Sequence, residues 1–184
     1  MKTQNFKSTS KHIVVLLMVF ATVISGYALV KANFSGDWAL DTEKSVFPAA
    51  PGGGGPPGGR GRGETKLKVT QTGTALTIVR TSPGRDGAEV LTTDNLTADG
   101  KESTSTGGRE GSVRKVTAKW SDDQNTVVIT TSTTMSFQGG DPMTIPGKET
   151  WSLSADGKVL TIDSERNSPM GGGATTSKLV YNKQ

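Results

Sequence analysis

The residues best suited to bind a charged small molecule are two arginines and one glutamate. Arg80 and Arg166 each extend a segment in which every second residue is apolar, and Glu149 lies on the same face as Trp151. A guanidinium can bind a carboxylate or a phosphate through two parallel hydrogen bonds. A carboxylate that is buried alone is costly, so Glu149 is expected to pair with one of the arginines. The alternative is that both arginines stand at strand ends and reach solvent.

Three further side chains are candidate contacts for the same ligand. Met135 and Phe137 extend another alternating segment, and Tyr181 offers a hydroxyl near the end of the chain. The three tryptophans are assigned to the core instead, because large aromatic side chains are most often buried there. The candidate binding residues are Arg80, Met135, Phe137, Glu149, Arg166 and Tyr181.

The composition excludes most catalytic and metal chemistry. The chain has no cysteine, and its single histidine, His12, lies near the amino terminus. Because residues 33–184 contain neither type, most metal sites and most nucleophile–base pairs are excluded, and no cofactor is expected. Glycoside hydrolysis would need two acidic residues facing one cleft. Glu149 is the only acidic residue expected to point inward, so we do not expect an enzyme.

Residues 1–32 have the layout of a secretory signal peptide, which is expected to be helical. A basic stretch precedes an apolar run at 13–24. Cleavage sites have small residues at the last and third-last positions before the cut, and the segments that end at Ala28 and at Ala32 both fit this pattern. The apolar run is shorter than the ~20 residues of a spanning helix. We expect removal of residues 1–32 and export of a single domain, 33–184, to the periplasm or the exterior, without stable membrane insertion. An uncleaved anchor is the alternative.

Charge is unevenly divided between this leader and the rest of the chain. The chain has 21 basic and 17 acidic residues, and residues 1–32 hold four lysines and no acidic residue. Residues 33–184 therefore carry no net charge, which argues against nucleic acid as a partner. We expect a monomer whose partner is a small apolar or amphipathic molecule.

Alternation of apolar and polar residues dominates residues 33–184 and predicts about ten strands. Short turns such as 98–100 and 155–157 alternate along the chain with longer Gly- and Pro-rich connections at 48–63, 82–87, 107–111, 138–142 and 167–173. In an antiparallel meander, alternate connections lie at opposite ends, so one end is tightly closed and the other carries the long connections. A sheet of this size without crossover helices is expected to close into an all-β, up-and-down barrel.

The first predicted strand, 34–40 (FSGDWAL), resembles the opening strand of the fatty-acid-binding proteins and the Gly-x-Trp signature of the lipocalins. Tyr181 matches the tyrosine of the closing Arg-x-Tyr strand of the fatty-acid-binding proteins, with Leu179 in place of the arginine, and 48–63 stands where that family has two helices. The whole chain also resembles exported lipocalin-like proteins of bacteria. The resemblance implies a calycin-type barrel with Trp38 at its closed end, and no established activity.

The predicted inward faces change character along the barrel. They are apolar near the short turns and become small and polar toward the long connections, where serine and threonine dominate. A barrel of about eight strands is filled by its side chains or holds one small ligand. About ten strands lined by small residues are therefore expected to leave a cavity that binds a small apolar or amphipathic molecule.

Two other functions remain open from the sequence. In the first, the barrel is filled and the chain is a non-catalytic structural or interaction protein of the cell envelope. In the second, it is an outer-membrane barrel, which needs a continuous apolar outer band. Lysines and threonines on the faces opposite the apolar ones favour a soluble barrel over the second. The segment 48–63 is expected to be flexible, and it is an inert loop, a lid over the open end or, least in keeping with the neutral domain, an arginine–glycine tract for nucleic acid.

Overall fold

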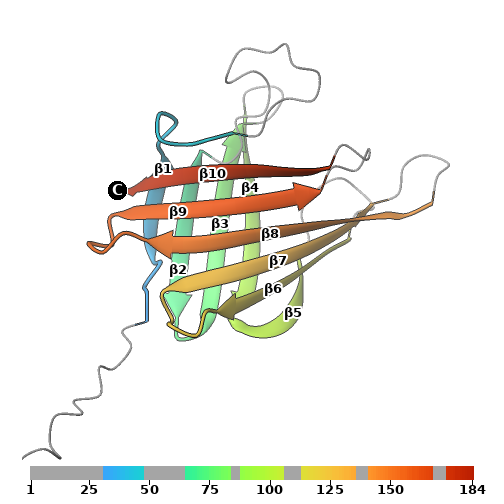
Figure 1. Ribbon diagram of the computed structural model, residues 1–184, viewed down its shortest axis with the longest axis horizontal. Helices are drawn as coiled ribbons and strands as arrows, with labels where there is room; N and C mark the ends of the chain where they lie inside the picture. Colours follow the sequence, from blue (N-terminus) through green and yellow to red (C-terminus); the bar gives the residue numbers. More distant parts are fainter. Residues whose placement is uncertain (1–30, 48–64, 84–87, 106–112, 136–140, 168–172) are drawn as a thin grey trace, which may run out of the picture.

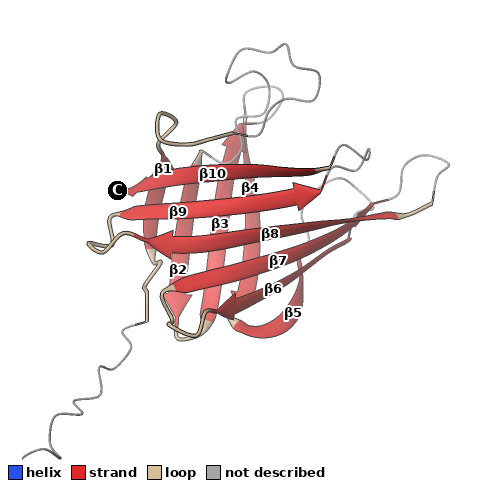
Figure 2. Ribbon diagram, viewed as in Figure 1, coloured by secondary structure: helices blue, strands red, loops and turns tan. Residues whose placement is uncertain are grey.

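The computed structural model describes residues 31–47, 65–83, 88–105, 113–135, 141–167 and 173–184. Within these residues every regular element is a strand, and turns and loops join the strands, as Figure 2 shows. Their bounds are β1 Gly36–Leu40, β2 Lys66–Thr72, β3 Ala75–Pro83, β4 Glu89–Thr97, β5 Asp99–Ser105, β6 Val113–Trp120, β7 Thr126–Met135, β8 Met143–Leu153, β9 Val159–Asn167 and β10 Ala174–Lys183. The predicted signal-peptide helix, the segment 48–63 and Phe137 lie outside the described residues.

The ten strands form one antiparallel sheet in the order β4-β3-β2-β1-β10-β9-β8-β7-β6-β5. Pairing of β1 with both β2 and β10 joins the two ends of the chain, and β4 and β5 stand at the two ends of the order. In Figure 1, β6–β10 lie in front and run across β1–β4 behind them, with β5 curving between the two groups. The molecule is an all-β, up-and-down barrel that is nearly closed, which confirms the predicted fold class.

Alternation along each strand separates an apolar interior from a polar exterior, because successive side chains point to opposite faces. In β7, for example, Val127, Ile129 and Thr131 are buried, whereas Thr130 is exposed. Trp38 and Trp151 belong to the core, and Trp120 packs against it, as predicted for the tryptophans. Among the described residues, no helix is long and apolar enough to cross a bilayer.

The two ends of the barrel differ in their connections. Residues 73–74, 98, 121–125 and 154–158 join consecutive strands at one end, which we call the base. Gly157 has a φ of 67°, which suits glycine, and the Asp156 carboxylate accepts the Lys158 N–H across the same turn. The strand ends that flank the undescribed connections all lie at the opposite end, called the rim. This division matches the predicted alternation of short and long connections.

Candidate functional site

A cavity of about 260 Å³ lies on the rim side of the core. Along β9, Ile162, Ser164 and Arg166 follow one another at every second position and all line it, so its wall changes from apolar to charged toward the rim. The hydroxyls of Ser164 and Ser177 lie 2.6 Å apart on adjacent strands. The cavity is lined by Phe47, Arg80, Thr131, Gly147, Lys148, Glu149, Ile162, Ser164, Glu165, Arg166, Thr175, Thr176, Ser177 and Leu179.

Gly147 keeps part of this space open. It stands opposite Thr131 on β7 and Arg166 on β9 in the strand register. A Cβ atom at this position would lie 2.7 Å from Thr131 Oγ1, which is closer than a carbon and a hydroxyl oxygen can approach. A side chain here would therefore force the Thr131 side chain to shift.

Four charged side chains cross the interior beside the cavity. Arg80 Nη2 lies 2.9 Å from Glu149 Oε2, and Arg114 Nη1 lies 2.6 Å from Asp94 Oδ1. Arg80 Nε is 3.6 Å from Asp94 Oδ2, which joins the two pairs into one group. The side chains of Arg80, Asp94, Arg114 and Glu149 are 6%, 1%, 15% and 15% exposed. Two positive and two negative charges make this group, the charge network, neutral as a whole.

The charge network sets the ionisation of Glu149. Burial by itself raises the pKa of this carboxyl, because the charged form loses water. The positive charge of Arg80, hydrogen bonds from the Trp151 indole and Arg80, and the charge of Arg114 outweigh that effect and hold the pKa of Glu149 below its usual value. The Trp151 Nε1–H donates to Glu149 Oε2 over 2.9 Å. The lowered pKa favours the ionised form of Glu149, which lies 2.9 Å from Arg80 Nη2.

The predicted pairing of Glu149 with an arginine is confirmed, and the partner is Arg80. The alternative that Arg80 reaches solvent is wrong, because its side chain is 6% exposed and lies between two carboxylates. Sequence reasoning missed Asp94 and Arg114. The signal was present, since Asp94 alternates with Leu96 and Arg114 alternates with Val116, in the same way that marked the other inward positions.

Arg166 differs from Arg80 in both exposure and partners. Its side chain is exposed at the rim end of β9 and lines the cavity. Within the described part of the chain, its guanidinium has no hydrogen-bond or ion-pair partner. Arg166 can therefore offer both its charge and its paired N–H donors to a molecule in the cavity.

The remaining predicted contacts occupy other places. Tyr181 is fully buried in the core, where it stands between Leu40 and Leu160 in the strand register. Met135 ends β7, half-buried, opposite Met143. Neither residue lines the cavity. Phe137 lies outside the described residues, so the structure brings together Arg80, Glu149 and Arg166 from the predicted set.

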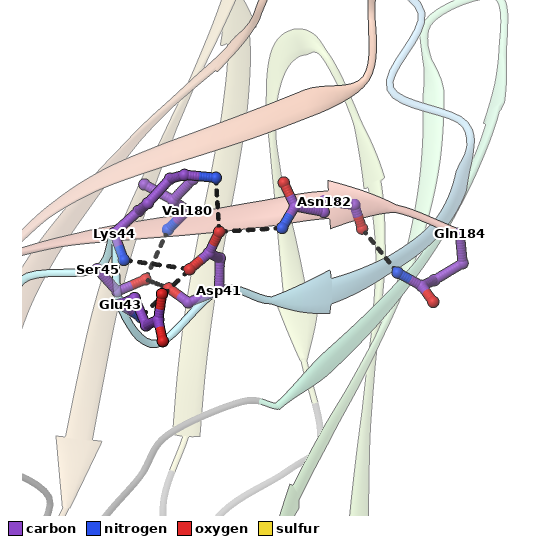
Figure 3. A network of polar contacts seen from close by, with 7 residues as sticks. All are labelled: Asp41, Glu43, Lys44, Ser45, Val180, Asn182 and Gln184. Carbon is purple, nitrogen blue, oxygen red and sulfur yellow. Dashed lines mark hydrogen bonds and ion pairs between the residues drawn. The ribbon is translucent and has the colours of Figure 1, made fainter.

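The turn after β1 brings a residue that the sequence did not single out, Phe47, to the cavity. Asp41 Oδ1 accepts the backbone N–H groups of Glu43 and Lys44, and Asp41 Oδ2 accepts from Lys44 Nζ and from Asn182 Nδ2. Figure 3 shows how this carboxylate lies between the turn and β10. The Lys44 ammonium, the Asn182 amide and the Lys44 N–H lower the pKa of Asp41 to about 2.

Ser45 fastens the same turn to β10. Its Oγ donates to Asp41 O at 2.6 Å and accepts the Val180 N–H at 2.9 Å, as Figure 3 also shows. Val46 then forms a β-bridge with Lys178. These contacts fix the path of residues 41–46 along the outer edge of β10, and the next residue, Phe47, lies against the cavity.

Within the described residues, no group of three or more acidic or histidine side chains is placed to hold a metal ion. The site is thus a small polar cavity with one exposed guanidinium at its rim and a neutral charge network beside it. No family model, no curated protein and no solved structure matches the chain.

Proposed function

We propose that this chain is an exported barrel that binds a small amphipathic molecule in its cavity, with an anionic group of the ligand on Arg166. The observation that supports the proposal is the Arg166 guanidinium, which has no partner among the described residues and lies at the rim of a cavity whose inner end is apolar at Ile162. A ligand with one anionic end and a short apolar end complements that arrangement. The resemblance to the lipocalins and fatty-acid-binding proteins supports the same class of function.

The size of the cavity limits the ligand to a short one. A volume of about 260 Å³ corresponds to roughly nine water molecules at liquid density. It lies just below the ≈ 300–1,000 Å³ that is usual for pockets that bind drug-sized molecules. Leu179, which stands where the fatty-acid-binding proteins have a carboxylate-binding arginine, also lines the cavity. We therefore place the anionic end at the rim and expect chains of about eight carbons or fewer to fit.

Calorimetric titration of the purified domain with octanoate and with octanol tests this proposal. Hydrogen bonds to charged groups contribute about 1.5–3 kcal/mol, and exposure of Arg166 favours the lower end of that range. Arg166→Ala is expected to weaken octanoate binding about tenfold and to leave octanol binding unchanged. Lys158→Ala, which removes one positive charge from a turn at the base, is the matched control. Equal loss in both variants, or no loss in either, would contradict a role for Arg166.

A second candidate function is supported by the charge network. Arg80, Asp94, Arg114 and Glu149 fill part of the interior and link strands β3, β4, β6 and β8. An interior braced in this way suits a non-catalytic structural or interaction protein of the cell envelope. Absence of binding of both octanoate and octanol to the folded protein would favour this second function. Native mass spectrometry of the protein from its own host discriminates further, because a co-purifying small molecule supports the first.

A further inference from the structure

Residues 31–35 form part of the base of the barrel. Lys31 Nζ donates to the carbonyl of Gly73 at 3.2 Å and lies 4.4 Å from the centre of the Trp120 ring. The Ala32 N–H donates to the carbonyl of Gln124 at 3.1 Å, and the Ala32 carbonyl accepts from Gln71 Nε2 at 3.0 Å. These two residues therefore contact two connections, 73–74 and 121–125, and two strands, β2 and β6.

Phe34 packs into the core at the base of the barrel. Its side chain is fully buried, stacks on Trp120 with ring centres 5.7 Å apart, and meets Trp151 edge-on at 6.0 Å. Its N–H donates to Gln71 Oε1, so the Gln71 amide holds the backbone on both sides of Asn33. The Phe34 carbonyl accepts from Trp38 Nε1 at 3.0 Å. We call residues 31–34 the base plug.

The base plug conflicts with removal of residues 1–32. Cleavage after Ala32 would remove the cation over Trp120 and both backbone hydrogen bonds of Ala32. It would also leave a terminal ammonium on Asn33, directly beside the fully buried Phe34. Residues that are discarded before the domain folds have no reason to fit its base in this way. The sequence offers a second site, since Gly26-Tyr27-Ala28 also has small residues at the two positions that a signal peptidase reads.

We propose that export processing cleaves the chain between Ala28 and Leu29, so that Lys31 and Ala32 remain as part of the folded barrel. In this hydrolysis, water adds to the carbonyl carbon of Ala28 and the C–N bond to Leu29 breaks. Ala28 leaves with the leader as a carboxylate, and Leu29 becomes the new amino terminus. The proposal rests on removal of the leader during export and does not depend on ligand binding.

The test is the amino terminus of the full-length chain after export from a bacterial host. A carboxyl-terminal tag allows recovery, and intact mass together with amino-terminal sequencing of the denatured protein identifies the first residue. The expected result is a chain that begins at Leu29. A chain that begins at Asn33, at any other residue, or at Met1 would overturn the proposal.

Two variants of the leader test separately which of the two candidate bonds is cleaved. Ala28→Leu places a large residue directly before the proposed bond, and the chain is expected to lose the Leu29 terminus and to accumulate as precursor. Ala32→Leu is the matched control and is expected to keep the Leu29 terminus. The reverse pattern, with loss of processing in Ala32→Leu alone, would show that the bond after Ala32 is the one cleaved. Folding of the variants does not affect either outcome, because the termini are read on denatured protein.

Discussion

At the scale of single residues, Asp41 shows how one carboxylate organises a turn. It accepts two backbone N–H groups within the turn and bonds with Lys44 and with Asn182 on β10. All of these contacts favour its ionised form, so they lower its pKa from 3.8 to about 2. These contacts are therefore strongest while Asp41 carries its charge.

The pKa of Asp41 leads to a prediction about acid stability. A group whose pKa is lower in the folded state stabilises the fold above its unfolded pKa, and that contribution disappears as the pH falls through the folded pKa. Asp41→Asn is therefore expected to be less stable than the parent at pH 7, with a difference that shrinks between about pH 4 and pH 2. Urea unfolding at a series of pH values measures this difference.

Asp122→Asn is the matched control for this experiment. Asp122 is an exposed turn residue whose side chain makes no hydrogen bond or ion pair within the described residues. Its substitution is expected to change the free energy of unfolding little at any pH. A difference between parent and Asp41→Asn that stays constant from pH 7 to pH 2 would contradict the proposed role of the Asp41 charge.

At the scale of elements, residues 41–46 lie along β10 through backbone hydrogen bonds of Asp41 and Val46 and through the side chain of Ser45. β1 pairs with β10 only from Trp38 to Leu40, and beyond that point Ser45 and Val46 take over the contacts with β10. The Val180 N–H has the Ser45 hydroxyl as its acceptor. Its protection from hydrogen exchange therefore depends on that one hydroxyl. This arrangement fixes where Phe47 meets the cavity.

Ser45→Ala tests this dependence. Loss of the hydroxyl leaves the part-buried Val180 N–H without its acceptor, which costs on the order of 1–3 kcal/mol. Hydrogen exchange measured by NMR is expected to show faster exchange at the Val180 amide, with little change at the Leu160 amide in the core. Ser45→Thr keeps a hydroxyl and is expected to restore protection. Unchanged exchange at Val180 in Ser45→Ala would contradict the assigned contact.

At the scale of the whole molecule, the charge network links strands that the sheet itself does not connect. Arg80 on β3 reaches Glu149 on β8 across the interior, and Arg114 on β6 reaches Asp94 on β4 past the β4–β5 end of the strand order. Because β4 and β5 share no ladder among the described strand pairs, the second link holds together the place where the barrel is not closed by backbone hydrogen bonds.

The balance of charge in the network can be tested with one single and one double variant. Glu149→Leu leaves an excess positive charge in the interior and is expected to cost about 3–5 kcal/mol of unfolding free energy. Arg80→Met combined with Glu149→Leu restores neutrality with apolar side chains and is expected to recover most of that loss. Urea unfolding followed by tryptophan fluorescence measures both.

An exposed ion pair serves as the reference for these variants. Lys115 and Glu102 lie 2.9 Å apart with side chains that are 54% and 51% exposed. Lys115→Met is expected to cost less than about 1 kcal/mol. If the double variant were as unstable as Glu149→Leu alone, charge balance would not explain the stability of the network.

Local sequence patterns were enough to predict about ten strands and the alternation of short and long connections. These features depend on local physics, because a period of two assigns each residue to a face and Asp-Gly pairs mark turns. The pairing of Glu149 with an arginine was also predictable, since a lone buried carboxylate is costly. The same alternation marked Asp94 and Arg114, although their partners could not be derived from it.

The contacts between inward residues, in contrast, follow from the folded barrel. A period of two gives the face of a residue but not the strand that lies opposite across the barrel, so Arg80 was expected near the rim and is instead held between Asp94 and Glu149. The small cavity at Gly147, the approach of Phe47 and the fit of residues 31–34 to the base depend on distances between segments far apart in the chain. Such distances are set by closure of the whole sheet, and no local pattern contains them.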